Sequence, residues 1–219
     1  KIAVVGAGIS GLYACYLLEQ QGISVDLIDR EDHIGGRMTS EQKNGFILDK
    51  GFHVLQTAYP LASSLFDYDT LGCKAFEPGA MVIDSDQQKP KIWLFSDPFR
   101  RPFRGLLSLF NRFTNPLNLL RVGLLRIRIA LISPSKLFET GKLSTYEYLS
   151  SRGFSKSFIN RFFVPLFGGI FLENELRTDE RMFKFVFANM SKGKMVLPKD
   201  GIQACPNYLF DQLNNTNLL

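Results

Sequence analysis

Residues 2–11 of the chain read IAVVGAGISG, a short β-branched run followed by three glycines in a G-x-G-x-x-G arrangement. The run predicts a strand, and the apolar pattern over residues 9–21 predicts a helix that begins inside the glycine motif and closes at Gly22. Residues 24–28 predict a second strand. Strand, glycine turn, helix and strand within about 30 residues make a βαβ unit with a right-handed, parallel crossover.

The three glycines and one acidic residue point to the ligand of this unit. Gly6 permits a tight turn, Gly8 lets the backbone approach a phosphate, and Gly11 lets the helix pack closely on the strand. The helix N-terminus presents free N–H groups and partial positive charge to phosphates. Asp29 ends the second strand, where a carboxylate can accept a hydrogen bond from a ribose hydroxyl. The unit is therefore a candidate dinucleotide site, for either NAD or FAD.

The segment after Asp29 separates these two cofactors. It contains HIGGR at residues 33–37 and GFILDKG at residues 45–51. At these residues the chain resembles the flavin amine oxidase superfamily, which includes monoamine oxidases, protoporphyrinogen oxidases and phytoene or carotene desaturases. The resemblance implies FAD as cofactor, with the Gly-Gly-Arg clamping its phosphates and the Asp49-x-Gly51 turn lying against the flavin end. Paired glycines expose backbone N–H groups, and a guanidinium offers planar donors to phosphate oxygens.

The resemblance extends further along the chain. Residues 163–171 (FVPLFGGIF) look like a stretch of the family's helical substrate domain, and residues 198–203 (PKDGIQ) look like its glycine turn back to the FAD domain. Three positions depart from the family pattern. Asp29 stands where most members have Glu, Glu31 where many have a phosphate-holding Arg, and Met38 where amine oxidases often have Thr.

We expect an α/β protein with a Rossmann-type FAD-binding βαβ unit, an inserted mixed β-hairpin and a mainly helical substrate domain. The expected domains are residues 1–57 (first part of the FAD-binding domain), residues 58–196 (substrate-binding, helical) and residues 197–219 (start of the return to the FAD domain). The chain begins inside a strand and stops as a helix finishes, and the resemblance covers about the first half of the family's length. We therefore expect an incomplete fragment of a longer protein.

The middle of the chain changes from strands to helices. Residues 80–84 and 91–95 predict an antiparallel hairpin, and residues 103–190 are predicted to be mainly helical. One of these helices is predicted from apolar residues spaced i, i+3, i+4, namely Leu117, Leu120, Leu124, Ile127 and Leu131. The 20 phenylalanines predict large apolar walls, in a core or in a pocket.

Several helix ends are marked in the sequence. Ser144 with Glu147 predicts a capping box at the start of a helix. Thr178 is expected to open another helix. Pro206 is expected to be the first residue of the last helix, which runs through Leu213.

The positive charge of the chain, net +5, is concentrated in one block. Residues 98–137 contain no Asp or Glu but eight cations: Arg100, Arg101, Arg104, Arg112, Arg121, Arg126, Arg128 and Lys136. The block is either a solvated helical face or a surface that docks on anionic membrane. The apolar side chains inserted into the membrane would be those of Phe99, Phe103, Leu106, Leu107, Phe110 and Phe113. We expect no nucleic acid, because no recognition motif accompanies the charge.

Other chemistries have little support. The three cysteines (Cys15, Cys73 and Cys205) lack metal-type spacing, as do His33 and His53, so no metal site is expected. Two histidines in turn-like contexts support no Ser-His-Asp arrangement. The longest charge-free stretch, residues 51–66, contains Pro60, so no transmembrane helix is expected. We expect a cytoplasmic or peripheral-membrane location for the protein.

We expect an FAD-dependent oxidoreductase in which the flavin takes a hydride equivalent from an apolar small molecule, as in desaturation or in oxidation of a porphyrinogen or amine. No catalytic side chain is assigned, because the cofactor performs the redox step. An FAD-fold isomerase such as a sugar mutase stays open, as does a fragment that is inactive by itself. The expected cofactor-binding residues are Gly6, Gly8, Ile9, Ser10, Gly11, Asp29, Arg30, Gly35, Gly36, Arg37, Asp49 and Gly51.

Overall fold

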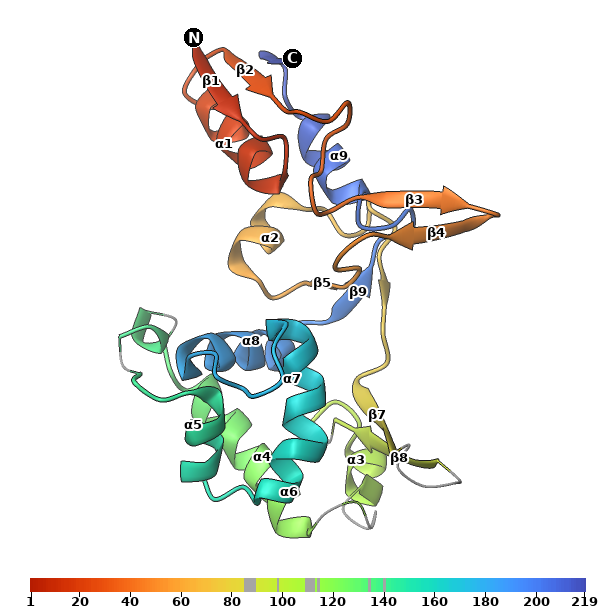
Figure 1. The fold of residues 1–219 in the computed structure, drawn as a ribbon, viewed down its shortest axis with the longest axis vertical. Coiled ribbons are helices and arrows are strands. Elements are labelled where there is room, and N and C mark those ends of the chain that lie inside the picture. The colour runs from red at the N-terminus through yellow and green to blue at the C-terminus, as the bar shows by residue number, and fades with distance from the viewer. Residues whose placement is uncertain (85–89, 98, 109–112, 114, 134, 140) are drawn as a thin grey trace. The chain divides into compact units, whose positions relative to one another are not determined.

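The computed structural model of the 219-residue chain describes all residues except 85–89, 98, 109–112, 114, 134 and 140 (Figure 1). The chain divides into two compact units. The first unit combines Lys1–Phe76 with Gly193–Leu219, and the second is the continuous segment Glu77–Lys192. The chain therefore leaves the first unit 19 residues later than the expected boundary at residue 57 and returns to it four residues earlier than residue 197.

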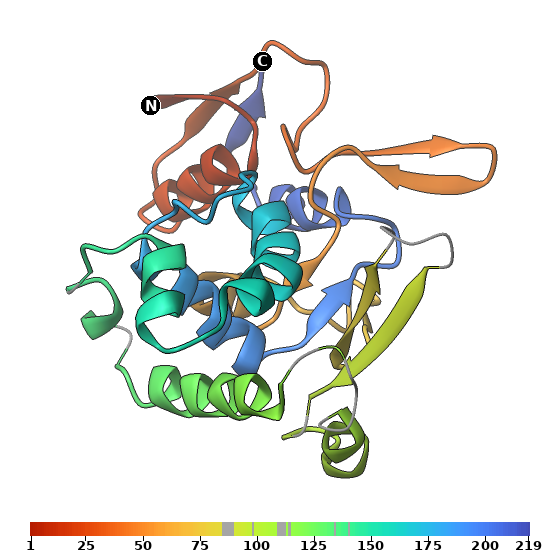
Figure 2. The ribbon, with the colours of Figure 1, turned by 60° about the horizontal axis from the view of Figure 1, so that its bottom comes forward.

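A three-stranded parallel sheet forms the start of the first unit. Strands β1 (Ile2–Val5) and β2 (Val25–Ile28) are joined by helix α1 (Ile9–Glu19), as the sequence predicts. The third strand, β10 (Thr216–Leu218), pairs with the other edge of β2, so that the order is β1-β2-β10. Figure 2 shows this last strand, in blue, beside the first two in red.

The end of the chain differs from its prediction, because residues 216–218 form a strand and not the end of a helix. Glu19 at the end of α1 explains the position of this strand. Its carboxylate accepts hydrogen bonds from the N–H groups of Asn214 and Asn215 and from the hydroxyl of Thr216. These bonds turn the chain after helix α9 (Ala204–Phe210) and deliver β10 to β2.

Helix α9 begins two residues earlier than predicted. Pro206 is its third residue, where a missing N–H costs nothing because first-turn N–H groups have no helical partner. The helix can start at Ala204 because Gly201, with φ of +80°, turns the chain just before it. Cys205 and Leu209 on its inner face are fully buried.

Two smaller sheets complete the first unit. Strands β3 (Ser40–Lys43) and β4 (Phe46–Asp49) form a hairpin whose turn residues, Asn44 and Gly45, both have positive φ. Strands β5 (Leu55–Gln56), β9 (Met195–Leu197) and β6 (Lys74–Ala75) form an antiparallel sheet in the order β5-β9-β6.

Helix α2 (Pro60–Leu65) belongs to the first unit. Ala62 and Leu65 of this helix pack against the buried residues Phe66, Leu71 and Val196. This apolar cluster explains why the first unit extends past residue 57, since it joins the segment after β5 to β9 near the end of the chain.

The second unit contains the predicted hairpin and the predicted helices. Strands β7 (Gly79–Asp84) and β8 (Lys91–Ser96) are antiparallel. The helical elements are α3 (Pro102–Ser108), α4 (Pro116–Ala130), a 3₁₀ turn η1 (Ser135–Leu137), α5 (Thr145–Ser151), α6 (Lys156–Phe158), a π-helical segment η2 (Ile159–Phe163), α7 (Val164–Phe171) and α8 (Glu180–Lys192).

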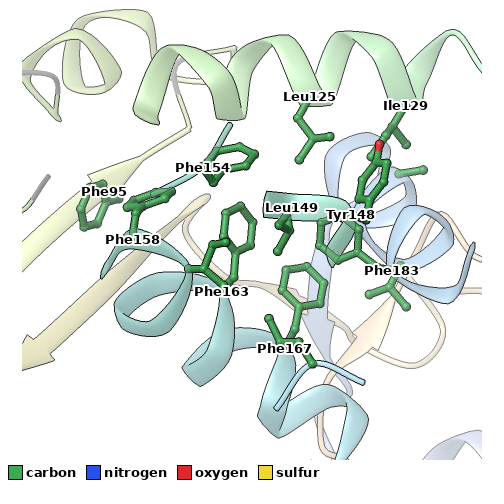
Figure 3. Close-up of a cluster of buried hydrophobic side chains, with 14 of the residues drawn as sticks. Phe95, Leu125, Ile129, Tyr148, Leu149, Phe154, Phe158, Phe163, Phe167 and Phe183 are labelled. Atoms are coloured by element: carbon green, nitrogen blue, oxygen red, sulfur yellow. The ribbon is translucent and has the colours of Figure 1, made fainter. Parts of the chain in front are cut away.

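Phenylalanines build the core of the second unit (Figure 3). Phe163, Phe167 and Phe183 are fully buried, and the rings of Phe167 and Phe183 lie 4.7 Å apart, edge to face. Phe158 joins them from α6 through an edge-to-face contact with Phe163 at 5.6 Å. Much of the phenylalanine surplus is therefore core, because edge-to-face pairs favour dense packing of aromatic rings.

The predicted starts of two helices are tested by the structure. The capping box of Ser144 and Glu147 is confirmed at the start of α5. The start of α8 was placed one residue too early at Thr178. It is Asp179 that accepts a hydrogen bond from the Arg181 N–H, while the hydroxyl of Thr178 turns to Glu173. Asp179 directly precedes the helix, so its carboxylate can accept from a first-turn N–H group and serves as the cap.

The predicted helix α4 is confirmed, but its apolar row is exposed. The row Leu117, Leu120, Leu124, Ile127 and Leu131 is 46–81% exposed. The buried residues of α4 are instead Asn118, Leu125 and Ile129. We call the exposed row the α4 ridge. Among the described residues, no helix is long and apolar enough to span a membrane.

Candidate cofactor-binding site

The first glycine turn has the geometry that its motif requires. Gly6 has a φ of +106°, and its N–H donates to the carbonyl oxygen of Ile28 at 2.7 Å. A Cβ on Gly11 would lie 1.8 Å from the carbonyl oxygen of Gly6, so only glycine lets α1 start this close to the turn. A Cβ on Gly8 would meet no atom within 4 Å, so there is open space beside its backbone.

The N-terminus of α1 faces this turn with its N–H groups available. Gly8 is the N-cap and has no side chain to accept from them. The first turn of the helix holds no acidic residue. The first helical hydrogen bond is donated by Leu12 to Gly8, which leaves the N–H groups of Ile9, Ser10 and Gly11 without helical partners. Such an end attracts anions.

Asp29 lies at the end of β2 and ties that strand to the glycine turn. Its Oδ2 accepts from the N–H of Ala7 at 2.6 Å, and its Oδ1 accepts from the N–H of Glu31 at 3.0 Å. Backbone hydrogen bonds from Glu31 and Ala7 hold the pKa of Asp29 below its usual value. The carboxylate is therefore ionised at neutral pH, and its oxygens keep further lone pairs for a hydroxyl donor.

A second glycine turn meets the first. The N–H of Gly35 donates to the carbonyl oxygen of Ala7 at 2.8 Å, and Gly8 and Gly35 form a parallel β-bridge. A Cβ on Gly36 would lie 3.3 Å from the Cα of Gly8. Both glycines have positive φ, +113° and +56°. Residues 27 positions apart in the sequence thus form one continuous backbone surface at the start of α1.

The basic residues of the site differ in their surroundings. Arg37 follows the second glycine turn, is exposed, and has no ion-pair partner among the described residues. Arg30 is also exposed, but its guanidinium pairs with Glu31 at 3.0 Å. Glu31 therefore competes with a phosphate for the guanidinium of Arg30, although an exposed ion pair of this kind is weak and easily exchanged.

The Asp49-x-Gly51 turn is also brought to the site. A Cβ on Gly51 would lie 2.7 Å from the carbonyl oxygen of Arg37, so the two segments pack backbone to backbone. Oδ1 of Asp49 accepts from the hydroxyl of Ser40 at 2.6 Å and from the N–H of Ile202 at 3.0 Å. Its carboxylate links the β3–β4 hairpin to the turn before α9.

Two residues that sequence reasoning did not single out, Ser40 and Gln203, join this network. Gln203 hydrogen-bonds to Ile34 and Ser40 from more than 160 residues away in the chain. The glycine turn at residues 198–203 was the only signal near Gln203, and a turn by itself does not name a partner.

Other titratable groups form no second site among the described residues. No group of three His, Cys, Asp or Glu side chains there could hold a metal ion. His33 makes only an exposed contact with its neighbour Asp32. Burial raises the pKa of Cys205 to about 12, so its thiol is unreactive at neutral pH.

The parallel sheet, the uncapped start of α1 and the paired glycine turns define a dinucleotide-binding protein of the Rossmann type. In agreement, the family model of the NAD(P)-binding Rossmann-like domain matches residues 4–68. Protoporphyrinogen oxidase 2 of Arabidopsis thaliana is 40% identical over 67 residues, which is 31% of this chain and 13% of that protein. The 4,4'-diapophytoene desaturase of Staphylococcus aureus is 43% identical over 51 residues, or 23% of this chain and 10% of the desaturase.

A solved structure of putrescine oxidase has the same fold over 100% of this chain, with a TM-score of 0.63 and 21% identity. The chain spans about half, 50%, of the length of that structure. Over part of its length the chain is similar in sequence to members of the flavin amine oxidase superfamily. FAD is the cofactor of this family, and the residues present fit it, since open space lies beside Gly8 and the start of α1 is uncapped.

Proposed function

We propose that this chain is the cofactor-binding part, with the helical substrate unit, of an FAD-dependent oxidoreductase that takes a hydride equivalent from an apolar substrate. The observation that carries the proposal is the meeting of two glycine turns at Gly8 and Gly36, directly at the start of α1. The uncapped N–H groups of α1 and the backbone of the second glycine turn lie together there, which suits recognition of a pyrophosphate.

Each site residue has a role in this proposal. The first-turn N–H groups of α1 and the Gly35-Gly36 turn would hold the pyrophosphate, and the exposed guanidinium of Arg37 would add charge-assisted hydrogen bonds. Asp29 would accept from a ribose hydroxyl. When bound, the flavin supplies the electron sink for hydride transfer. The protein's part is to position the cofactor, and no side chain of this chain is assigned to proton transfer.

An apolar substrate is supported by the β7–β8 hairpin. Two cross-strand pairs, Met81 with Leu94 and Ile83 with Ile92, lie on one face and are 58–65% exposed. The opposite face packs on the phenylalanine core through Val82 and Phe95. An exposed apolar face of this kind suits contact with a porphyrin-like or polyene substrate more than with a sugar nucleotide.

The proposal is tested by Gly8→Val in the full-length protein reconstituted with FAD. A Cβ at this position would meet no protein atom within 4 Å, so we expect the fold to persist while the valine side chain fills the space for the pyrophosphate. We expect the wild type to show the visible spectrum of bound flavin and the variant to lose it. Gly123→Val, also in open space but in α4, is the matched control and should keep the spectrum. Unchanged FAD binding in Gly8→Val would refute the assignment.

Turnover separates the oxidoreductase from a flavin-dependent isomerase. An oxidoreductase transfers electrons to an acceptor such as oxygen or a quinone, so the bound flavin should be reduced by substrate and reoxidised by the acceptor. An isomerase such as a sugar mutase would show turnover without net consumption of the acceptor. The isolated 219 residues, which make up part of the family's length, are expected to be inactive.

We also propose that the α4 ridge contacts an anionic membrane surface. Ion pairs neutralise part of the positive charge of the basic block, because Asp97 pairs with Arg100 and Arg126, and Glu77 pairs with Arg101. Arg128 and Lys136 are exposed and lie close to the ridge in the sequence. Residues 98–137, which include both, contain no acidic residue. Exposed leucines flanked by cations favour anionic lipid over zwitterionic lipid.

The apolar insertions expected between residues 99 and 113 have different outcomes. Phe99 and Phe103 are exposed, whereas Phe113 is buried in the phenylalanine core and is not available. Phe110 and Arg112 lie outside the described residues, as do the side chains of Leu106 and Leu107.

A further inference from the structure

The side chain of Gln203 holds the second glycine turn from both ends. Its Nε2 donates to the carbonyl oxygen of Ile34 at 2.8 Å, just before Gly35. Its Oε1 accepts from the N–H of Ser40 at 3.4 Å, just after the turn. A neutral carboxamide is suited to this task because it carries a donor and an acceptor on one rigid group.

Gln203 is itself fixed by its neighbours. Its backbone N–H donates to the hydroxyl of Ser40 at 3.1 Å, and that hydroxyl donates to Asp49 at 2.6 Å. Asp49 also accepts from the N–H of Ile202 at 3.0 Å. Asn207, one turn into α9, accepts a further bond from Nε2 at 3.3 Å. The carboxamide is therefore held in one orientation by both the hairpin and the helix.

The glycine turn lies between Gln203 and the start of α1. A Cβ on Gly35 would lie 2.9 Å from Nε2 of Gln203, and one on Gly36 would lie 3.3 Å from the Cα of Gly8. Paired glycines can adopt many backbone conformations, so their own sequence does not hold them in this one. A contact from outside the turn is needed to hold it against Gly8 at the start of α1.

We propose that Gln203 is a positioning residue for the pyrophosphate of the cofactor. It acts through the backbone of Ile34 and Ser40, which fixes the Gly35-Gly36-Arg37 turn against Gly8 before the ligand arrives. The affinity of the protein for the cofactor then increases, because the conformational entropy of the turn is lost on folding and not on binding. The inference rests on the proposed function, since it assigns Gln203 to the same phosphate site.

Gln203→Met tests the proposal in the full-length protein. Methionine keeps the length and packing of the side chain but removes both hydrogen bonds to the turn. We expect the dissociation constants of FAD and ADP, measured by titration calorimetry, to rise about tenfold, the order expected for losing two hydrogen bonds. Hydrogen exchange of the ligand-free protein should quicken at residues 35–40 alone. Gln212→Met is the matched control, because the side chain of Gln212 donates to the carbonyl oxygen of Tyr208, within its own segment.

Gln203→Glu provides a rescue that a purely structural role would not predict. An ionised carboxylate keeps the acceptor for Ser40 but cannot donate to Ile34, whereas a protonated carboxyl can do both. Relative to wild type at the same pH, the affinity of this variant for ADP should recover as the pH is lowered into the carboxyl range. The neighbouring carboxylates, Asp29 and Asp49, are present in both proteins, so the ratio to wild type removes their contribution.

The outcomes separate this inference from the proposed function. If wild type binds neither FAD nor ADP, the proposed function fails and the inference fails with it. If wild type binds and Gln203→Met binds equally well, the function stands and the positioning role is wrong. Weaker binding with unchanged exchange at residues 35–40, or with faster exchange throughout the first unit, would also overturn the positioning role.

Discussion

Asp29 uses both of its carboxylate oxygens to hold backbone N–H groups, one from the first glycine turn and one from the loop that follows β2. The carboxylate therefore closes the end of the strand onto the turn, in addition to any contact with a ribose. The shorter side chain of Asp, which departs from the family's usual Glu, reaches Ala7 at 2.6 Å. Asp29 thus contributes both to the backbone conformation of the site and to its negative charge.

The stability of the first unit should depend on the ionisation of Asp29. Its pKa is lower in the folded protein, so its contribution is complete above the unfolded pKa and is lost as the pH falls through the folded pKa. Asp29→Asn should lower the melting temperature at neutral pH, and the difference from wild type should shrink in acid. Thermal melts across pH measure this.

Asp200→Asn serves as the control for that series, because Asp200 is exposed and accepts no hydrogen bond among the described residues. It should follow the wild-type curve. A difference between Asp29→Asn and wild type that stays constant at every pH would show that the carboxylate charge is not what matters.

The residues of the site were predictable where their chemistry is local. Gly6, Gly8 and Gly11 stand at fixed spacing because one turn and one helix start determine all three. Gln203 was not predictable in this way, because its partners lie 163 and 169 residues earlier. A glutamine far along the chain carries no local sign of which backbone groups it will meet.

Helix α4 shows what an apolar repeat does and does not determine. The i, i+3, i+4 spacing places five residues on one face and predicts the helix correctly. It does not decide whether that face is covered. In the second unit Leu125 and Ile129 occupy the covered face and pack on the phenylalanine core, so the α4 ridge is left exposed.

The proposed membrane contact makes a prediction for this helix. Leu124→Ser should weaken binding of the full-length protein to phosphatidylserine vesicles roughly tenfold, because one buried leucine contributes on that order. Leu17→Ser is the matched control, since Leu17 is a helical leucine of nearly equal exposure in α1, 47% against 48%. Vesicle co-sedimentation measures both variants.

Lipid composition and salt test the electrostatic part of the same prediction. Binding should fall in phosphatidylcholine vesicles and at high ionic strength, because exposed charges are screened. Equal binding to both lipids, or no binding to either, would contradict the proposal. A change in oligomeric state caused by Leu124→Ser would assign the ridge to a protein contact instead.

The whole molecule consists of two units with separate apolar clusters. The phenylalanine cluster lies entirely between residues 80 and 190, within the second unit. Phe167 in this cluster is fully buried among the rings of Phe163, Phe171, Phe183 and Phe187. The sequence predicted both parts but not the limits between them, because packing across the chain sets those limits.

Phe167→Ala should therefore destabilise one unit selectively. Removing a fully buried ring costs about 3–5 kcal/mol. Hydrogen exchange should rise across residues 77–192 and remain near wild type in residues 1–76 and 193–219. Phe103→Ala, at an 86% exposed position of the same unit, should change little. A uniform rise along the whole chain would show that the two units unfold together.

The way Gln203 and β10 complete the first unit has a consequence for synthesis on the ribosome. The glycine turns are translated before the second unit, yet the side chain that holds them and the strand that extends their sheet are translated after it. The second unit is contiguous and has its whole core available earlier, so it is the first able to fold. The nascent chain must keep strands β1 and β2 unaggregated through that interval, and the cofactor site can be completed only after the second unit has been translated.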